Sequence, residues 1–344
     1  MTYTNEQLSQ KARELALQHV TTLPRTRPAY IEQHFKKDIE SLRDFVLSLQ
    51  TVHAGCTQPA EQWLLDNAEF VEEQAQEVRA LLLQDGLGRM PRLRGSGLLR
   101  IQSVMEDYLT HVEGILSEET ILVYIQAYQE VSALTLTEAR SVPLILRLVL
   151  VKKLAETMAF VRERREVCID VGRILSLIEP AALSPETVHL QVEKAGLTIP
   201  LPGPWIVHLI SHLREWAGDT ASVREWLICS YENGAEDLDR IVSYEHQLQA
   251  AYQVRAGSVI TSLRKNERWD WNGLFEQISL PDRTLRLEYT GVYPLLDAYS
   301  RNQILAEVER LARRLRVPEN LVAGQAAALA REAAERADAA RAGS

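Results

Sequence analysis

The chain has 344 residues, of which 46% are hydrophobic and 25% are charged, proportions typical of a soluble globular protein with a sizeable core. Its formal net charge of -9 argues against a general nucleic-acid-binding protein, because such proteins need a basic surface to release counterions from phosphates.

The first half of the chain has the hydrophobic spacing of amphipathic helices. Apolar residues recur every three or four positions across residues 27–50 and again across residues 59–85, which predicts two helices. Pro59 lies at a plausible first turn of the second helix. Ser117 has the position of an N-cap before another helical pattern.

The pattern from Thr137 onward is also helical, and Pro143 inside it predicts a kink or a break. Prolines crowd residues 199–204, which predicts an extended linker and suggests a boundary between subdomains 1–200 and 201–344. No clear alternating strand pattern stands out, but the short segment RTLRLEY, residues 283–289, could be a strand.

The last residues, from Val317 to Ser344, are rich in alanine and therefore helical by propensity. Taken together, the elements predict an all-α fold, an irregular array of antiparallel helix pairs that ends in a long Ala-rich helix.

Cysteine usage and hydropathy bear on the compartment. Cys56, Cys168 and Cys229 lie far apart and form no metal-ligand spacing, which predicts free thiols in a reducing compartment. The polar N-terminus lacks the pattern of a secretory signal. The most apolar run, residues 142–160, contains three basic residues and is too charged to span a bilayer. We therefore expect a cytoplasmic protein with no membrane span.

Few motifs for chemistry are present. The chain has neither a Gly-rich phosphate loop nor a GxSxG nucleophile elbow. His208 and His212 have the spacing of two metal ligands on a helix, and Glu215 is a candidate third ligand only by proximity. Two partly buried histidines on an amphipathic helix are the preferred interpretation, so we expect no metal and no cofactor.

The sequence Trp269-Asp270-Trp271 permits two interpretations. The tryptophans could stack on a sugar while the carboxylate binds its hydroxyls. Alternatively, Asp270 is the N-cap of a following helix and the tryptophans pack against neighbouring helices. The residues alone favour the structural interpretation.

Three blocks of residues resemble one known family. The first block matches a W-L-L-D-N motif followed by E-E-Q, at Trp63, Asp66, Asn67, Glu72, Glu73 and Gln74. The second matches at Ala127, Tyr128, Gln129, Leu134, Thr135, Glu138, Pro143 and Arg147. The third matches at Glu245, His246, Gln249, Gln253, Gly257, Arg264, Asp270, Trp271, Glu276, Arg286 and Tyr293. With these blocks in the same order, the chain resembles the N-terminal helical region of cyclic β-1,2-glucan synthases, which are large bacterial inner-membrane glucosyltransferases.

The chain departs from the family pattern at several positions and therefore resembles a divergent member. Ala139 and Arg140 stand where the family has Leu-Trp, and Tyr289 and Thr290 replace an acidic-proline pair. The resemblance implies a non-catalytic, cytoplasmic helical scaffold, and it carries over no catalytic residue. The implied partners are the glucosyltransferase and membrane-spanning parts of the same or a parent polypeptide, and a β-1,2-glucan chain.

Two other functions stay open. One is a β-glucan-binding module in which Trp269 and Trp271 stack on sugar rings. The other is a divergent glycosyltransferase or glycoside hydrolase, whose acids would come from Glu72, Glu73, Glu245 and Asp270.

Overall fold

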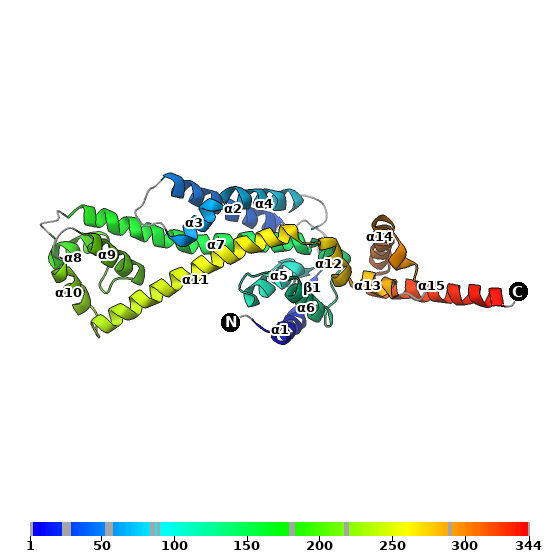
Figure 1. The fold of residues 1–344 in the computed structure, drawn as a ribbon. Coiled ribbons are helices and arrows are strands. Elements are labelled where there is room, and N and C mark those ends of the chain that lie inside the picture. Colours follow the sequence, from blue (N-terminus) through cyan, green and yellow to red (C-terminus); the bar gives the residue numbers. More distant parts are fainter. Residues whose placement is uncertain are drawn as a thin grey trace. The chain divides into compact units, whose positions relative to one another are not determined.

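A computed structural model describes residues 3–22, 29–51, 58–82, 87, 90–178, 183–216, 220–287 and 291–342. Most of these residues are helical (Figure 1), which confirms the all-α class. The helices are α1 (Asn5–Gln18), α2 (Ala29–Thr51), α3 (Pro59–Asp66), α4 (Ala68–Leu82), α5 (Arg100–His111), α6 (Glu118–Gln129), α7 (Leu136–Ser176), α8 (Pro185–Lys194), α9 (Gly203–Glu215), α10 (Ala221–Cys229), α11 (Ala235–Arg268), α12 (Trp271–Ile278), α13 (Leu280–Arg286), the 3-10 helix η3 (Tyr293–Leu295), α14 (Ala298–Leu315) and α15 (Glu319–Ala342). Two short strands, β1 (Thr21–Thr22) and β2 (Arg92–Leu93), pair antiparallel.

The chain divides into two compact units. The first comprises residues 1–35, 74–150 and 261–344, and the second comprises residues 36–73 and 151–260. The predicted linker at 199–204 lies inside the second unit, because the chain leaves the first unit along α7 and returns to it along α11. Residues 195–202 are indeed non-helical between α8 and α9. Independent folding of 1–200 and 201–344 stays a prediction.

In the first unit, α1, α5, α6 and the first half of α7 all contribute fully buried side chains. Tyr108 and Tyr124 are fully buried with their rings 5.5 Å apart. A smaller core joins the start of α7 to the C-terminal helices through Leu136, Leu285, Tyr293, Leu305, Val308 and Ala323. The Leu136 N–H donates to Glu319 Oε2 at 2.6 Å, so the first turn of α15 is tied to the first turn of α7.

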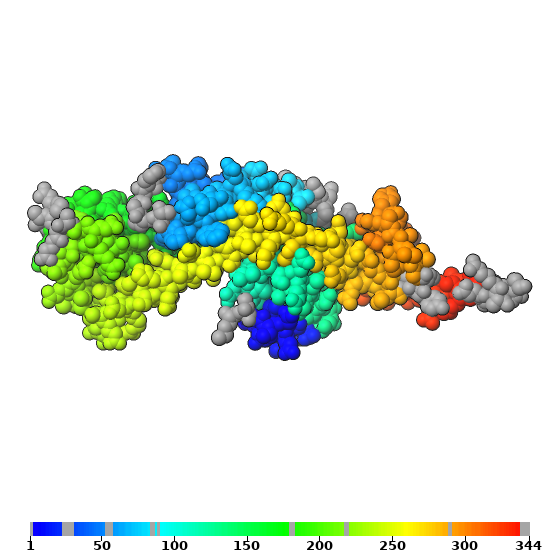
Figure 2. All heavy atoms as spheres, in the orientation of Figure 1, coloured from blue at the N-terminus to red at the C-terminus, as the bar shows by residue number. Residues whose placement is uncertain are grey.

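In the second unit, one core is formed where the end of α7 packs with α8, α9, α10 and the start of α11. Its buried members include Val171, Ile174, Val188, Ile206, Leu209, Val223 and Leu227. In Figure 2 the described atoms of α8, α9 and α10, drawn in green to yellow-green, are closely packed. This core fixes α9 and the start of α11, which carry several candidate residues.

Four local predictions can be compared with the helices. Pro59 is at the first position of α3 and Ser117 is the N-cap residue of α6, so both predictions are confirmed. Of the kink or break expected at Pro143, the break is wrong, because α7 is helical through it, and the kink stays a prediction. A proline there removes a single intrahelical N–H donor, and its carbonyl accepts from Asn266 Nδ2 at 3.1 Å.

The expected strand at 283–289 is also wrong. Residues 280–286 form α13, because Ser279 caps that helix by accepting from the Asp282 N–H and Pro281 lies in its first turn. Residues 288–290 lie outside the described residues.

Candidate functional site

Glu138 is the centre of a buried ion-pair network in the first unit. The Arg100 Nε donates to Glu138 Oε1 at 2.8 Å, and the same guanidinium donates to Ser132 Oγ and to the Ala133 carbonyl, each at 3.0 Å. Glu138 Oε2 also accepts from the Thr135 N–H at 2.9 Å. The pair therefore joins α5 to the turn that begins α7.

The other candidates in the first unit also make structural contacts. Arg147 pairs with Glu77, whose side chain is half exposed. Glu276 accepts from Arg301 Nη2 at 2.9 Å and pairs with Arg286 at 2.7 Å. The Tyr293 hydroxyl donates to Asp282 Oδ1 at 2.7 Å, and burial raises the pKa of this tyrosine. Gln74 is buried, whereas Arg264 is exposed.

Asp270 is the N-cap of α12. One carboxylate oxygen, Oδ1, accepts from the N–H groups of Asn272 and Gly273, both at 3.1 Å. Trp271 donates its Nε1–H to the Asn266 carbonyl at 2.7 Å, and the rings of Trp269 and Trp271 lie 5.5 Å apart. The geometry is the helix cap of the structural interpretation.

Removing this cap should measurably weaken the fold. We expect Asp270→Ala to lower the free energy of unfolding by about 1 kcal/mol, because two N–H groups of α12 lose their acceptor. Asp270→Asn, which keeps an acceptor oxygen, is the matched control and should lose less. Urea unfolding followed by circular dichroism checks both variants, and an equal loss in the two would contradict the cap.

Two buried ion pairs connect helices in the second unit. Arg164 Nε donates to Glu245 Oε2 at 3.2 Å, and Arg165 Nη1 donates to Glu61 Oε2 at 3.0 Å. All four side chains are less than a tenth exposed. Burial raises the pKa of Glu61, against the opposing effects of the Gln58 N–H and Arg165. These pairs join α7 to α11 and to α3.

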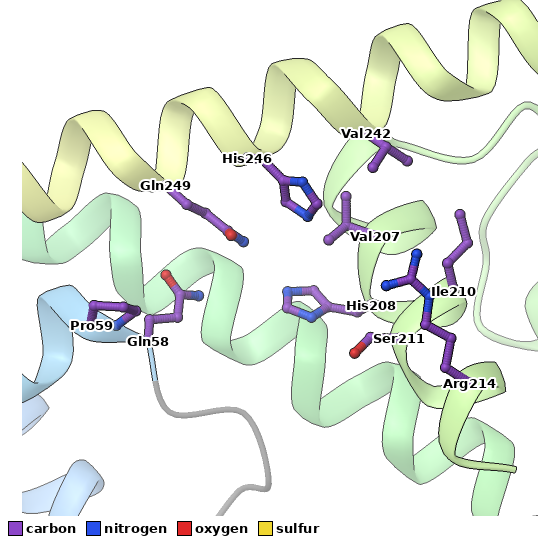
Figure 3. Close-up of a pocket in the computed structure, with 10 residues that line it drawn as sticks. All are labelled: Gln58, Pro59, Val207, His208, Ile210, Ser211, Arg214, Val242, His246 and Gln249. Atoms are coloured by element: carbon purple, nitrogen blue, oxygen red, sulfur yellow. The ribbon is translucent and has the colours of Figure 1, made fainter.

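Near these pairs lies a polar cavity, formed by α9, α11 and the start of α3 (Figure 3). The empty space in the cavity and at its open mouth amounts to about 730 Å³. Its lining residues are Gln58, Pro59, Val207, His208, Ile210, Ser211, Arg214, Val242, His246 and Gln249. Figure 3 shows the amide of Gln58 and the ring of His208 pointing into the same space, below His246 and Gln249.

His208 is the most strongly perturbed group of the cavity. Its ring is buried and its Nε2 has no hydrogen-bond partner. Burial lowers its pKa to about 4, helped by the positive charge of Arg164 and by neighbouring His212. His208 is therefore neutral at pH 7 and can donate or accept a single hydrogen bond through Nε2.

This lowered pKa predicts a pH dependence of stability. As the pH falls, the unfolded chain protonates this histidine near its ordinary pKa of 6.5, whereas in the folded chain the pKa is about 4. The free energy of unfolding should therefore fall between those values, by up to about 3 kcal/mol for this group. His208→Gln does not titrate, so the difference between the native chain and this variant in urea unfolding, measured from pH 7 to 4, isolates the effect. Parallel curves for the two proteins would contradict it.

A second hollow adjoins this cavity along α3 and α11. It is lined by Pro59, Gln62, Trp63, Asp66, Asn67 and Gln253. Trp63 is 40% exposed, and its indole packs over Gly257, where an added Cβ would lie 3.2 Å from the ring. Gln62 Nε2 donates to Asp66 Oδ1 at 2.6 Å. The structure thus brings three residues of the first motif block together with Gln253 of the third.

The remaining candidates of the second unit lie elsewhere. Glu72 pairs with Arg43, and Glu73 is exposed. His212 packs near Gly172, 3.4 Å from where a Cβ would be, and Glu215 is exposed. Among the described residues, no group of three or more His, Cys, Asp or Glu side chains could hold a metal ion.

Two further predictions concern the compartment. Cys229 is a free, exposed thiol, as predicted, but Cys168 is disulfide-bonded, which contradicts the prediction for that residue. Cys56 lies outside the described residues. Within the described ranges, no helix has the length and apolarity needed to cross a membrane.

Sequence reasoning missed Gln58, Ser211 and Arg214 as cavity residues. The available signal was the stripe Val242, His246, Gln249 and Gln253 on α11, whose spacings of four, three and four place them on one helix face. The residues of α9 and α3 that face this stripe carry no local signature.

The fold and the site together define an all-α protein with buried ion pairs and a polar cavity. No protein-family model matches the chain. The chain is 28% identical over 289 residues to the cyclic beta-(1,2)-glucan synthase NdvB of Rhizobium meliloti (strain 1021). This similarity confirms the resemblance to the cyclic β-1,2-glucan synthases that the three motif blocks predicted. The match covers 82% of this chain and 10% of that synthase, so the chain spans about a tenth of the length of its relative.

Proposed function

We propose that the chain is a non-catalytic helical scaffold that supports glucan synthesis by a cyclic β-1,2-glucan synthase-like enzyme. The similarity to such a synthase over 82% of the chain carries this proposal. The scaffold would act through contacts with glucosyltransferase and membrane-spanning parts of the same or a parent polypeptide.

The contacts of the motif residues favour a structural role over a catalytic one. Glu138 and Glu245 are held by buried arginines, Glu72 is paired with Arg43, and Asp270 caps a helix. A glycoside hydrolase needs two carboxyl groups that face one another across a substrate. In the two hollows along α3 and α11, Asp66 is the one carboxylate among the described lining residues.

A cytoplasmic location next to a bacterial inner membrane is part of the proposal. The disulfide at Cys168 is evidence against a cytoplasmic location, because disulfides are rare in reducing compartments. Acid quenching of intact source cells, followed by alkylation in denaturant with and without prior reduction, distinguishes a free Cys168 thiol from a disulfide, and the denaturant is needed because Cys168 is buried. Cys168 should be alkylated without reduction if the chain is cytoplasmic.

The size of the native polypeptide and the activity of the isolated chain test this proposal. In source cells, an antibody against the chain should detect a polypeptide whose mass is several times that of these 344 residues. The isolated chain, incubated with UDP-glucose or with linear β-1,2-glucan, should release neither UDP nor new sugar ends. A native product of the size of this chain would contradict the partnership within one polypeptide, and turnover by the isolated chain would contradict the non-catalytic role.

A further inference from the structure

Two buried polar atoms in the cavity of Figure 3 have no hydrogen-bond partner. They are Gln58 Nε2 and His208 Nε2. Both side chains are at least nine-tenths buried and both line the cavity. A buried polar atom without a partner costs about 1 to 3 kcal/mol. The arrangement is therefore one that a ligand with hydrogen-bonding groups would stabilise.

The chemistry of these two atoms restricts the ligand. The Gln58 amide nitrogen can only donate, whereas the neutral imidazole nitrogen donates or accepts according to its tautomer. A hydroxyl group satisfies both, because its oxygen accepts one hydrogen bond while its proton donates another. Ser211 and Gln249 in the same lining can also act in both directions.

The charge of the two hollows favours a neutral ligand. Arg214 in the cavity and Asp66 in the second hollow carry opposite charges. Amide side chains dominate the rest of the polar lining: Gln58, Gln62, Asn67, Gln249 and Gln253. Amides present a donor and an acceptor side by side, which matches neighbouring hydroxyls on one molecule.

Trp63 supplies an apolar platform beside these amides. Gly257 lies against its indole, and 40% of the residue is exposed. The face of an aromatic ring is electron-rich, so it attracts the weakly positive C–H groups on one side of a pyranose. Pro59 lines both hollows, so a chain of sugar rings could extend from one hollow to the other.

We propose that the cavity and the second hollow, which together form a groove between α3, α9 and α11, bind a neutral oligosaccharide. Sugar hydroxyls would bond to Gln58 and His208, and one sugar ring would stack on Trp63. The inference rests on the proposed function for its choice of sugar, a linear β-1,2-linked glucooligosaccharide. It replaces Trp269 and Trp271 as the stacking platform with Trp63.

Calorimetric and NMR titration of the full chain with linear β-1,2-glucooligosaccharides at millimolar concentration tests the proposal. Trp63→Ala and Gln58→Leu should each weaken binding by about tenfold or more, since each loses at least one contact worth about 1.4 kcal/mol. Gln58→Leu removes the unsatisfied Nε2 and also the capping-box contact of the Gln58 side chain with the first turn of α3, so circular dichroism must first show native helical content at the titration temperature. If Gln58 acts only as a cap, the folded variant should bind sugar as the native chain does.

Matched controls give each outcome a meaning. Tyr244→Ala removes an aromatic side chain of α11 that is 60% exposed and lines neither hollow, and it should bind sugar normally. Loss of binding in Trp271→Ala but not in Trp63→Ala would overturn the assignment. Competition by inorganic phosphate would show that Arg214 and His246 bind an anion, which would also overturn it.

Failure of this inference and failure of the proposed function are distinguishable. If no oligosaccharide binds while removal of the region still abolishes glucan synthesis, the groove is not a sugar site but the scaffold role stands. If sugar binds and removal has no effect on synthesis, the groove stands and the scaffold role fails.

Discussion

Glu138→Ala should destabilise the chain by about 3 to 5 kcal/mol, because it leaves the charge of Arg100 buried without a partner. Arg100 is 5% exposed and Glu138 is fully buried. The variant also removes the acceptor for the Thr135 N–H at the start of α7. Urea unfolding at pH 7, followed by circular dichroism, measures the loss.

Two further variants show whether the loss comes from the unpaired charge. Glu77→Ala breaks the half-exposed pair with Arg147 and should cost about 1 kcal/mol or less. The double variant Arg100→Met, Glu138→Leu removes both charges and should recover part of the loss. A loss in Glu138→Ala no larger than in Glu77→Ala would contradict the importance of the buried pair.

Glu245→Ala should produce a loss of the same size in the second unit, about 3 to 5 kcal/mol. It leaves Arg164 buried without its carboxylate, although the guanidinium keeps its position 3.3 Å from the Phe160 ring centroid. Gly203 lies so close that an added Cβ would be 2.8 Å from Glu245 Oε1, so Gly203→Ala should also displace this carboxylate and destabilise the unit.

The matched control in this unit is Glu72→Ala. Its partner Arg43 has 44% of its side chain exposed, so the change should cost about 1 kcal/mol or less. Thermal unfolding and urea unfolding of the two variants should rank them in the same order. If Glu245→Ala is as stable as Glu72→Ala, the Arg164–Glu245 pair does not hold α7 to α11.

Local structure was largely predictable because its causes lie within a few residues. Asp270 caps α12 through N–H groups two and three positions away, so the sequence around it predicts the cap. Pro59 and Ser117 mark helix starts for the same reason. The strand prediction at 283–289 overlooked the helix start signal at Ser279 and Pro281.

The site was only partly predictable because its contacts join distant parts of the chain. Arg100 and Glu138 are 38 positions apart, and Arg164 and Glu245 are 81 apart. The motif blocks contained Glu138, Glu245 and Trp63 but not their surroundings. Gln58 and His208 meet in one cavity because three separate helices pack there, and no local pattern in the sequence specifies that meeting.

The output of cyclic β-1,2-glucan tests the central claim most directly. The coding region for these 344 residues would be deleted in the source cells, and glucan would be quantified with and without the chain restored. The account predicts that synthesis falls to background on deletion and returns with the native sequence, while membrane levels of the remaining polypeptide stay comparable. Normal amounts of glucan of normal ring size after the deletion would contradict a scaffold role in its synthesis.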